Sequence, residues 1–171
     1  MEPFSVGSVL NFDNRKTFFG MVIGKFTDSK FTHSGIVYNY SINHVWVAEA
    51  VSRGFKVNKY SRKELTKRLN NKTLQSRSSV VKLVDVRKHC NKYLGIKYGY
   101  FTLLQIAIMI AIGKRYTSDG IKTLICSEGV SRVFYDASCH LVDISKEFEC
   151  RFDYVTPKML SESTQLETWI R

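Results

Sequence analysis

Short runs of β-branched and aromatic residues occupy most of the first third of the chain. Such runs predict strands over residues 5–12, 17–26, 31–38, 44–50 and 54–58. The polar segment 39–43 separates two of them and is typical of a hairpin turn. Two further short strands are predicted later in the chain, over residues 79–84 and 152–155.

Helical spacing of apolar positions dominates the rest of the chain. A capping-box pattern at residues 61–64 predicts a helix over 62–69, and Asp85 precedes a second helix over 86–94 that ends at Gly95. Further helices are predicted over 101–112 and 126–135, and Pro157 is expected to begin a last short one. Early strands and late helices predict an α+β domain over residues 1–171, with a mostly antiparallel sheet packed against helices.

The positive charge is concentrated in one part of the chain. Residues 51–100 hold 14 Lys and Arg against Glu64 and Asp85, which is a net charge of +12; the remaining residues hold 12 basic and 13 acidic side chains, a net of −1. This excess indicates either an anionic partner, such as nucleic acid, anionic lipid or an acidic polymer, or a solubilising surface.

Cysteine usage and hydropathy suggest where the protein works. Its four cysteines lack the spacing of structural zinc sites, so we expect no metal and no cofactor. No signal peptide is visible, and the longest apolar run, 101–113, is shorter than the roughly 20 residues that span a bilayer. We therefore expect a protein with reduced thiols in the cytoplasm of a bacterial or phage-infected cell, without a transmembrane segment. Its oligomeric state stays open.

Cys126 and His33 are the candidate reactive residues. Cys126 opens a predicted helix, so its sulfur lies near the positive end of the helix dipole, which favours the thiolate. Each residue alone has an ordinary explanation, because free cysteine is commonly a small buried hydrophobe and a lone strand histidine commonly a hydrogen-bonded core residue. Together they predict a cysteine nucleophile with a histidine base, the combination used for acyl transfer.

Glu49 is the candidate third member of this site. A hairpin turn centred on Ser41 places His33 opposite Glu49 and Gly35 opposite Val47, with both pairs on one face of the sheet. The carboxylate would then orient the imidazole and stabilise its protonated form. Gly35 would leave room beside the histidine for another backbone or a substrate. A slip of one residue in the register would abolish the pairing.

Three motifs resemble one known family: His-Ser-Gly-Ile-Val at 33–37, Ala-Glu-Ala at 48–50 and Cys-Ser-Glu at 126–128. They look like the signatures of the circularly permuted papain-like amidases of the NlpC-type superfamily, particularly the YiiX-like group. The order His, Glu, Cys is that of the permuted group, and the similarity covers roughly residues 4–157. Gly129 departs from the pattern, since the family usually has a larger apolar residue there. This departure predicts looser packing behind the nucleophile.

The resemblance implies Cys126 as nucleophile, His33 as general base and acid, and Glu49 as the orienting residue. It implies a permuted papain-like hydrolase that cleaves an amide bond of a peptide or cell-wall stem, or an ester or thioester of an acyl lipid, through a thioester intermediate. Three other readings stay open. The first is a lipid acyltransferase of the same fold, and the second is a non-enzymatic nucleic-acid-binding protein that uses the basic segment 51–100 and its interspersed aromatic residues. The third is a degenerate member of the fold that binds without cleaving, against which the intact Cys, His and Glu set argues.

Overall fold

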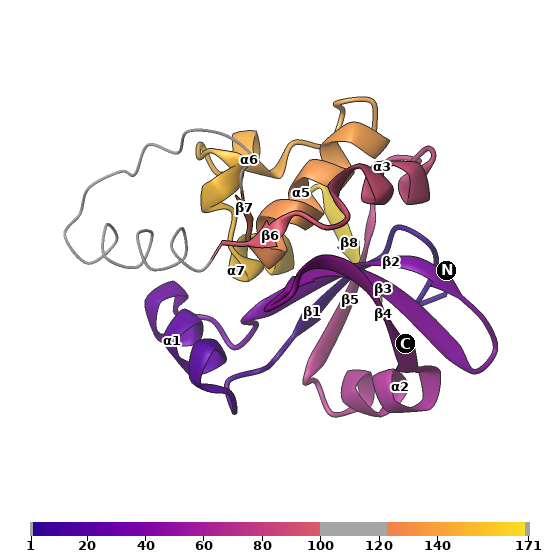
Figure 1. Ribbon diagram of the computed structural model, residues 1–171, viewed down its shortest axis with the longest axis vertical. Coiled ribbons are helices and arrows are strands. Elements are labelled where there is room, and N and C mark those ends of the chain that lie inside the picture. Colours follow the sequence, from indigo (N-terminus) through magenta and orange to yellow (C-terminus); the bar gives the residue numbers. More distant parts are fainter. Residues whose placement is uncertain (1, 100–122, 170–171) are drawn as a thin grey trace.

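The computed structural model describes residues 2–99 and 123–169, and Figure 1 shows how their elements are arranged. The strands are β1 (Val9–Phe12), β2 (His33–Tyr40), β3 (His44–Val51), β4 (Gly54–Ser61), β5 (Leu74–Ser79), β6 (Lys97–Tyr98), β7 (Thr123–Leu124) and β8 (Leu166–Thr168). The helices are α1 (Phe18–Thr27), α2 (Arg62–Asn70), α3 (Val86–Tyr93), α5 (Cys126–Ala137), α6 (Ile144–Glu147) and α7 (Pro157–Glu162), with a 3-10 turn over Phe152–Tyr154.

One antiparallel sheet organises the described residues. Its strands lie in the order β4-β3-β2-β1-β5-β8, and β6 pairs with β7 in a separate, parallel ladder. The strands β2, β3 and β4 follow one another as a meander, whereas β5 and β8 join the other edge after intervening helices. The predicted α+β class with a mostly antiparallel sheet is confirmed.

Helices cover both faces of this sheet. On one face, α3, α5 and α6 bury their apolar side chains against alternate strand residues such as Ile36, Ala48 and Ala50. On the other face, Leu65 of α2 packs with the intervening residues, among them Val47. Figure 1 shows α3, α5 and α6 above the sheet and α2 below it. The period of two in β2 and β3 therefore divides the core into two clusters.

The predicted strand over 17–26 is wrong, because this segment forms α1. Its aromatic and β-branched residues favour a strand, but both ends carry helix caps. The Thr17 hydroxyl accepts the Gly20 N–H at 3.1 Å, and Asp28 adopts a left-handed conformation (φ 47°) with its N–H donating to the Gly24 carbonyl. The two caps satisfy backbone groups that the helix leaves unpaired, and they outweigh the weak strand preference of the side chains.

Two later strand predictions are also wrong. The strand predicted over 79–84 lies earlier in the chain, as β5 over 74–79. Most of its residues are polar, but it is an interior strand of the sheet, because β1 and β8 pair with its two edges. Its buried Arg77 is accommodated by hydrogen bonds to the carbonyls of Leu160 and Leu166. The segment predicted as a strand over 152–155 begins instead with a 3-10 turn.

Helices predicted over 62–69, 86–94 and 126–135, and from Pro157, are confirmed within one or two residues. The apolar helix predicted over 101–112 lies outside the described residues. Within residues 2–99 and 123–169, none of the helices combines the length and the apolar character needed to cross a bilayer.

Candidate active site

Cys126 is the first residue of α5, as predicted. Ile125 before it is extended (φ −92°, ψ 162°), and the Glu128 carboxylate accepts the Ile125 N–H at 3.4 Å. The Ser127 hydroxyl donates to the Val155 carbonyl at 2.6 Å, which ties the start of the helix to the segment before α7. The Ser and Glu of the Cys-Ser-Glu motif therefore hold the helix start, where the dipole and free N–H groups favour a thiolate.

His33 and Glu49 meet across β2 and β3 by a route that differs from the prediction. The Nε2–H of His33 donates to the Glu49 Oε2 at 2.5 Å. The predicted register is wrong, because Val37 pairs with Val47 and a bulge follows Val37. Continued toward the start of β2, this register sets Gly35 opposite Glu49, so His33 reaches the carboxylate diagonally. A slip of two residues keeps every side chain on its predicted face, which is why the contact survives.

The space beside Gly35 is filled by protein. A Cβ at Gly35 would lie 2.5 Å from Val47 Cγ1 and 3.2 Å from Glu49 Cβ. The expectation that this glycine leaves room for a second backbone or a substrate is therefore wrong. It leaves room for the side chains of Val47 and Glu49, of which Glu49 contacts His33.

Asn58 and Tyr60 of β4 complete the environment of the carboxylate. The Asn58 amide donates to Glu49 Oε1 at 2.7 Å, and the Tyr60 hydroxyl donates to the same oxygen at 2.6 Å. Burial disfavours the charged form of Glu49, but hydrogen bonds from His33, Tyr60 and Asn58 outweigh it and hold the pKa of the carboxyl below its usual range. Burial and the adjacent Glu49 raise the pKa of Tyr60, so its hydroxyl stays protonated and remains a donor.

Cys126 and His33 form a coupled acid–base pair. Burial raises the pKa of the Cys126 thiol, but the charge and hydrogen bond of His33, together with the backbone N–H groups of Ser34 and Ser127, bring it below its ordinary value. Burial also opposes the His33 imidazolium, yet Cys126 and Glu49 raise its pKa to about 10. Because Glu49 takes the Nε2 side of the ring, Nδ1 is the nitrogen left for the sulfur. The stable combination is a thiolate beside an imidazolium.

The Phe12 side chain of β1 packs against the imidazole of His33. Phe12 is the direct cross-strand partner of His33, and their ring centroids lie 5.6 Å apart. Phe12 is only 1% exposed and also packs against Tyr60 at 6.0 Å. Cys126, His33 and Glu49, which are far apart in the sequence, are thus all brought together.

Gly129 behind the nucleophile is tightly packed, contrary to expectation. A Cβ at this position would lie 2.7 Å from Cε2 of the Phe55 ring. Phe55, on β4, therefore fills the space that a larger residue would occupy in α5. The helix of the nucleophile approaches the sheet closely at this glycine.

Asn58 and Tyr60 were missed as site residues by sequence reasoning. They alternate along β4, so they share a face, but neither residue type marks a site by itself. The register of β3 against β4 places Asn58 opposite Val47, on the face that carries Glu49. Knowledge of that register is the signal that would have identified them.

The remaining cysteines have different surroundings. Burial raises the pKa of Cys90 to about 12, and burial with nearby Asp153 and Asp143 raises the pKa of Cys150 to about 11. Cys139 is exposed in the loop after α5. Cys126 differs from Cys90 and Cys150 in that its pKa is lowered and theirs are raised.

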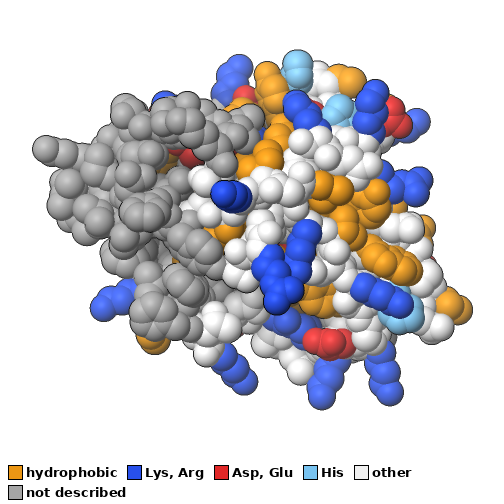
Figure 2. Space-filling view, viewed as in Figure 1, with side chains coloured by type: hydrophobic (Ala, Val, Ile, Leu, Met, Phe, Trp, Pro, Cys, Tyr) orange, Lys and Arg blue, Asp and Glu red, His pale blue; other side chains and the backbone are white. Residues whose placement is uncertain are grey.

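The basic segment 51–100 does not form one face. Most of its lysines and arginines lie on β4, α2, β5, α3 and β6, and Arg53, Lys72 and Lys82 lie in the connections between them. The core contacts place α2 on one side of the sheet and α3 on the other. Lys92 of α3 forms an ion pair with Asp136 at 2.8 Å. Figure 2 shows Lys and Arg side chains spread around the visible face rather than gathered in one stripe. A nucleic-acid groove would require a more continuous track.

Comparison with known proteins identifies the fold. No family model matches the chain, and no curated protein matches its sequence. Among solved structures it resembles the crystal structure of yiiX from Escherichia coli O157:H7, described as a metalloprotein of DUF1105, with a TM-score of 0.53 and 17% sequence identity. The match covers 99% of this chain and 98% of the other. The chain therefore has a YiiX-like fold.

The word metalloprotein in the description of that structure has no counterpart in the donor groups described for this chain. Across residues 2–99 and 123–169, no group of three or more His, Cys, Asp or Glu side chains is placed to hold a metal ion. At the candidate site, one Glu49 oxygen accepts from Asn58 and Tyr60 while the other accepts from His33. These oxygens are already used by protein donors, so no reaction step is assigned to a metal.

Proposed function

We propose that this chain is a cysteine hydrolase of the permuted papain-like type, with Cys126 as nucleophile, His33 as general base and acid, and Glu49 as the orienting residue. The observation that carries the proposal is the chain of contacts from the Cys126 thiol through His33 to the buried Glu49. A nucleophile, a base and a residue that orients the base are the three parts that covalent acyl transfer requires.

In the first step, the Cys126 thiolate attacks the carbonyl carbon of the substrate and forms a carbon–sulfur bond. The negative charge that develops on the carbonyl oxygen lies near the start of α5, where the backbone N–H of Ser127 is directed toward the sulfur. His33 then gives its proton to the leaving amine, alcohol or thiol as the bond to that group breaks. The product of this step is a thioester on Cys126.

In the second step, His33 takes a proton from a water molecule, whose oxygen attacks the thioester carbonyl carbon. The carbon–sulfur bond breaks, the acid product leaves, and the thiolate–imidazolium pair is restored. Glu49 stays ionised throughout and keeps Nδ1 of the imidazole directed at the sulfur. The proposed substrates are amides of peptides or cell-wall stem peptides and esters or thioesters of acyl groups.

Mass spectrometry of the intact protein tests this proposal. The protein is incubated with peptidoglycan fragments, peptide amides and acyl thioesters, and rapid acid quenching is expected to reveal an acyl adduct on Cys126 followed by release of the acid. Cys126→Ala is expected to form neither adduct nor product. Product formation that is equal in this variant would overturn the proposal. An adduct that passes to an added amine or alcohol in preference to water would identify the acyltransferase reading of the same site.

A further inference from the structure

A cleft of about 600 Å3 opens at the same end of the sheet as the candidate active site. It is formed by the loop before β2, the end of α2 with the turn that follows, the start of β5 and the end of β8; its lining residues include Lys30, Phe31, Lys72, Leu74 and Trp169. A volume of this size accommodates a small molecule or one part of a larger substrate.

The strand registers connect this cleft with His33. Phe12 of β1 pairs directly with His33 of β2 on one side and with Leu74 of β5 on the other. Directly paired residues share a face, so these three side chains form one row across adjacent strands. The two outer strands are about 10 Å apart, because each neighbouring pair is separated by about 4.8 Å. The part of the cleft at β5 is thus separated from His33 by the single strand β1. On the other side, Phe31 in the wall of the cleft precedes His33 by two residues.

The lining combines apolar walls with uncompensated positive charge. Phe31 and Leu74 are buried and Trp169 is half-buried, whereas Lys30 and Lys72 are exposed. Among residues 2–99 and 123–169, no acidic side chain lines the cleft and neither lysine forms an ion pair. The positive charge of Lys30 helps to lower the pKa of Asp13, but the Asp13 carboxylate forms its ion pair with the Arg15 guanidinium, at 2.8 Å. The surroundings therefore favour an anion attached to an apolar group.

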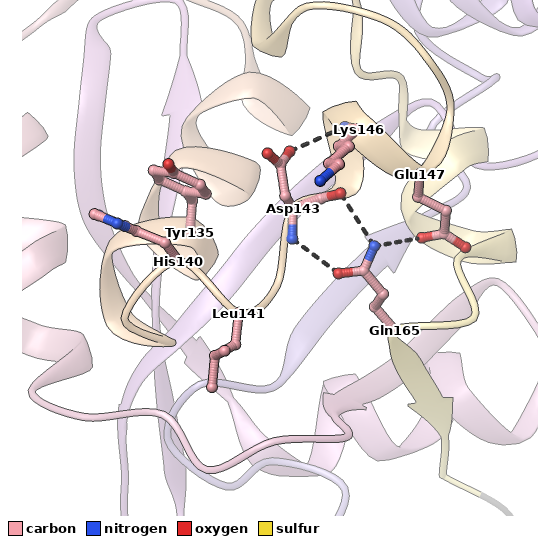
Figure 3. A pocket seen from close by; sticks show the side chains of 7 residues that line it. All are labelled: Tyr135, His140, Leu141, Asp143, Lys146, Glu147 and Gln165. Carbon is pink, nitrogen blue, oxygen red and sulfur yellow. Dashed lines mark hydrogen bonds between the residues drawn. The ribbon is translucent and has the colours of Figure 1, made fainter.

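The second cavity, drawn in Figure 3, has a different character. It measures about 500 Å3 and lies between α5, α6 and the start of β8, and hydrogen bonds join its residues Asp143, Glu147 and Gln165. The Gln165 amide donates to the Asp143 carbonyl at 3.0 Å and to the Glu147 carboxylate at 3.2 Å. Those contacts occupy the Gln165 amide and engage the Glu147 carboxylate. In the lysine-lined cleft, the Lys30 ammonium lies 4.9 Å from the centroid of the Phe31 ring, and in the part of the chain that the structure describes no carboxylate is paired with either lysine.

We propose that the cleft between Lys30, Lys72 and Trp169 is a substrate subsite that receives an acidic end of the acyl or peptidyl group, a carboxylate or a phosphate, while the scissile carbonyl lies at Cys126. This proposal rests on the proposed function. The apolar walls accommodate the chain that joins the acidic end to the carbonyl, and the lysines at the rim neutralise the charge.

Two reporter esters of equal chain length test the proposal: the mono-p-nitrophenyl ester of suberic acid, which ends in a carboxylate, and p-nitrophenyl octanoate, which does not. We expect the acidic ester to be hydrolysed with the higher kcat/KM. Lys30→Gln and Lys72→Asn are each expected to reduce that preference about threefold to fivefold, the size of a partly exposed ion pair, with the neutral ester unaffected. Lys72 stands at φ 57°, which asparagine adopts readily, so this variant retains the turn.

Lys63→Gln is the matched control, because it removes one charge from exposed α2 outside the cleft. Equal kcat/KM for the two esters, or an equal loss in Lys63→Gln, overturns the subsite.

A binding measurement separates the subsite from the proposed function. The chain has two tryptophans, so Trp46→Phe in a Cys126→Ala background leaves Trp169 as the sole indole reporter. Octanoate, octyl phosphate and octanol are titrated separately. A change in Trp169 emission with either anion, weakened by Lys72→Asn, supports the subsite even if no ester is hydrolysed, and the two anions distinguish a carboxylate from a phosphate. No response to either anion, or an equal response to octanol, refutes it.

Discussion

His33 and Glu49 are hydrogen-bonded at 2.5 Å from diagonal positions on neighbouring antiparallel strands, not from opposite ones. The diagonal contact requires that the residue opposite Glu49 leave the carboxylate stem free to lean toward His33. Gly35 provides this, since a Cβ there would lie 3.2 Å from the Glu49 Cβ. The glycine in His-Ser-Gly thus contributes to the site because it has no side chain.

Gly35→Ala is therefore expected to reduce both activity and stability. The added methyl group would lie 2.5 Å from Val47 Cγ1, and relief of this overlap displaces β3 or Glu49. Overpacking of this kind destabilises by about 1–3 kcal/mol. We expect a folded protein with at least tenfold lower kcat, measured by ester hydrolysis beside urea denaturation. Unchanged kcat would show that the diagonal contact tolerates a side chain at this position.

Tyr60→Phe tests whether Tyr60 positions the carboxylate. The substitution removes a 2.6 Å donor to buried Glu49 and leaves the aromatic packing on Phe12 in place. Loss of a hydrogen bond to a charged group costs about 1.5–3 kcal/mol, so the pKa of Glu49 rises and the carboxylate is held less firmly in place beside His33. Because Glu49 orients His33 in its ionised form, we expect a lower kcat with little change in KM, and an acidic limb of the pH–rate profile shifted to higher pH.

Tyr38→Phe serves as the control, because its hydroxyl bonds to Asn91 on α3, away from the site. A Tyr60→Phe profile that matches the profiles of Tyr38→Phe and the unaltered protein would assign Tyr60 a purely structural role.

Parts of this site were predictable because they depend on local patterns. The sequence shows a cysteine at the start of a helix, and a histidine and a carboxylate whose positions place them on the same face of adjacent strands. An error of two residues in the register does not change that face. Asn58 and Tyr60 depend on a third strand, so no local pattern marks them.

The fold shows the same division between local and non-local information. The helix over 126–137 has both amphipathic spacing and a capping carboxylate in its own sequence. The strand β5 is polar and owes its place to β1 and β8, which pair with it from distant parts of the chain. In α1, composition favoured a strand, and the caps at Thr17 and Asp28 decided otherwise.

The pH dependence of alkylation tests the thiolate directly. The pKa of Cys126 is lowered, so its thiolate persists as the pH falls below the ordinary thiol range, whereas the raised pKa values of Cys90 and Cys150 keep those thiols protonated. We expect the iodoacetamide reaction at Cys126 to stay fast at pH 6–7, as measured by peptide mass spectrometry. The pKa of about 10 for His33 places loss of the imidazolium, and the alkaline limb of activity, near pH 10.

His33→Ala removes the main opposing charge, so labelling of Cys126 should then require a higher pH. Exposed Cys139 is the internal reference for reagent access. Labelling of Cys126 that follows the same pH curve with and without His33 would contradict an ion pair at this site.

Gly129 and Phe55 are expected to be strongly coupled in stability. A Cβ at Gly129 would meet the Phe55 ring at 2.7 Å, and neither the ring, which is 1% exposed, nor the helix has free space to move into. Gly129→Ala should therefore destabilise the fold by about 1–3 kcal/mol despite the better helix propensity of alanine.

A double-mutant cycle with Phe55→Leu separates this overlap from a general effect on the helix. Phe55→Leu alone loses buried apolar area and is expected to destabilise, but in its presence Gly129→Ala should become neutral or stabilising, because the smaller side chain makes room for the methyl group. The free energies of unfolding from urea denaturation of the four proteins give the coupling energy. Additive effects would mean that the helix carrying Cys126 is not held against the sheet by this contact, and that α5 has room for the larger residue at position 129.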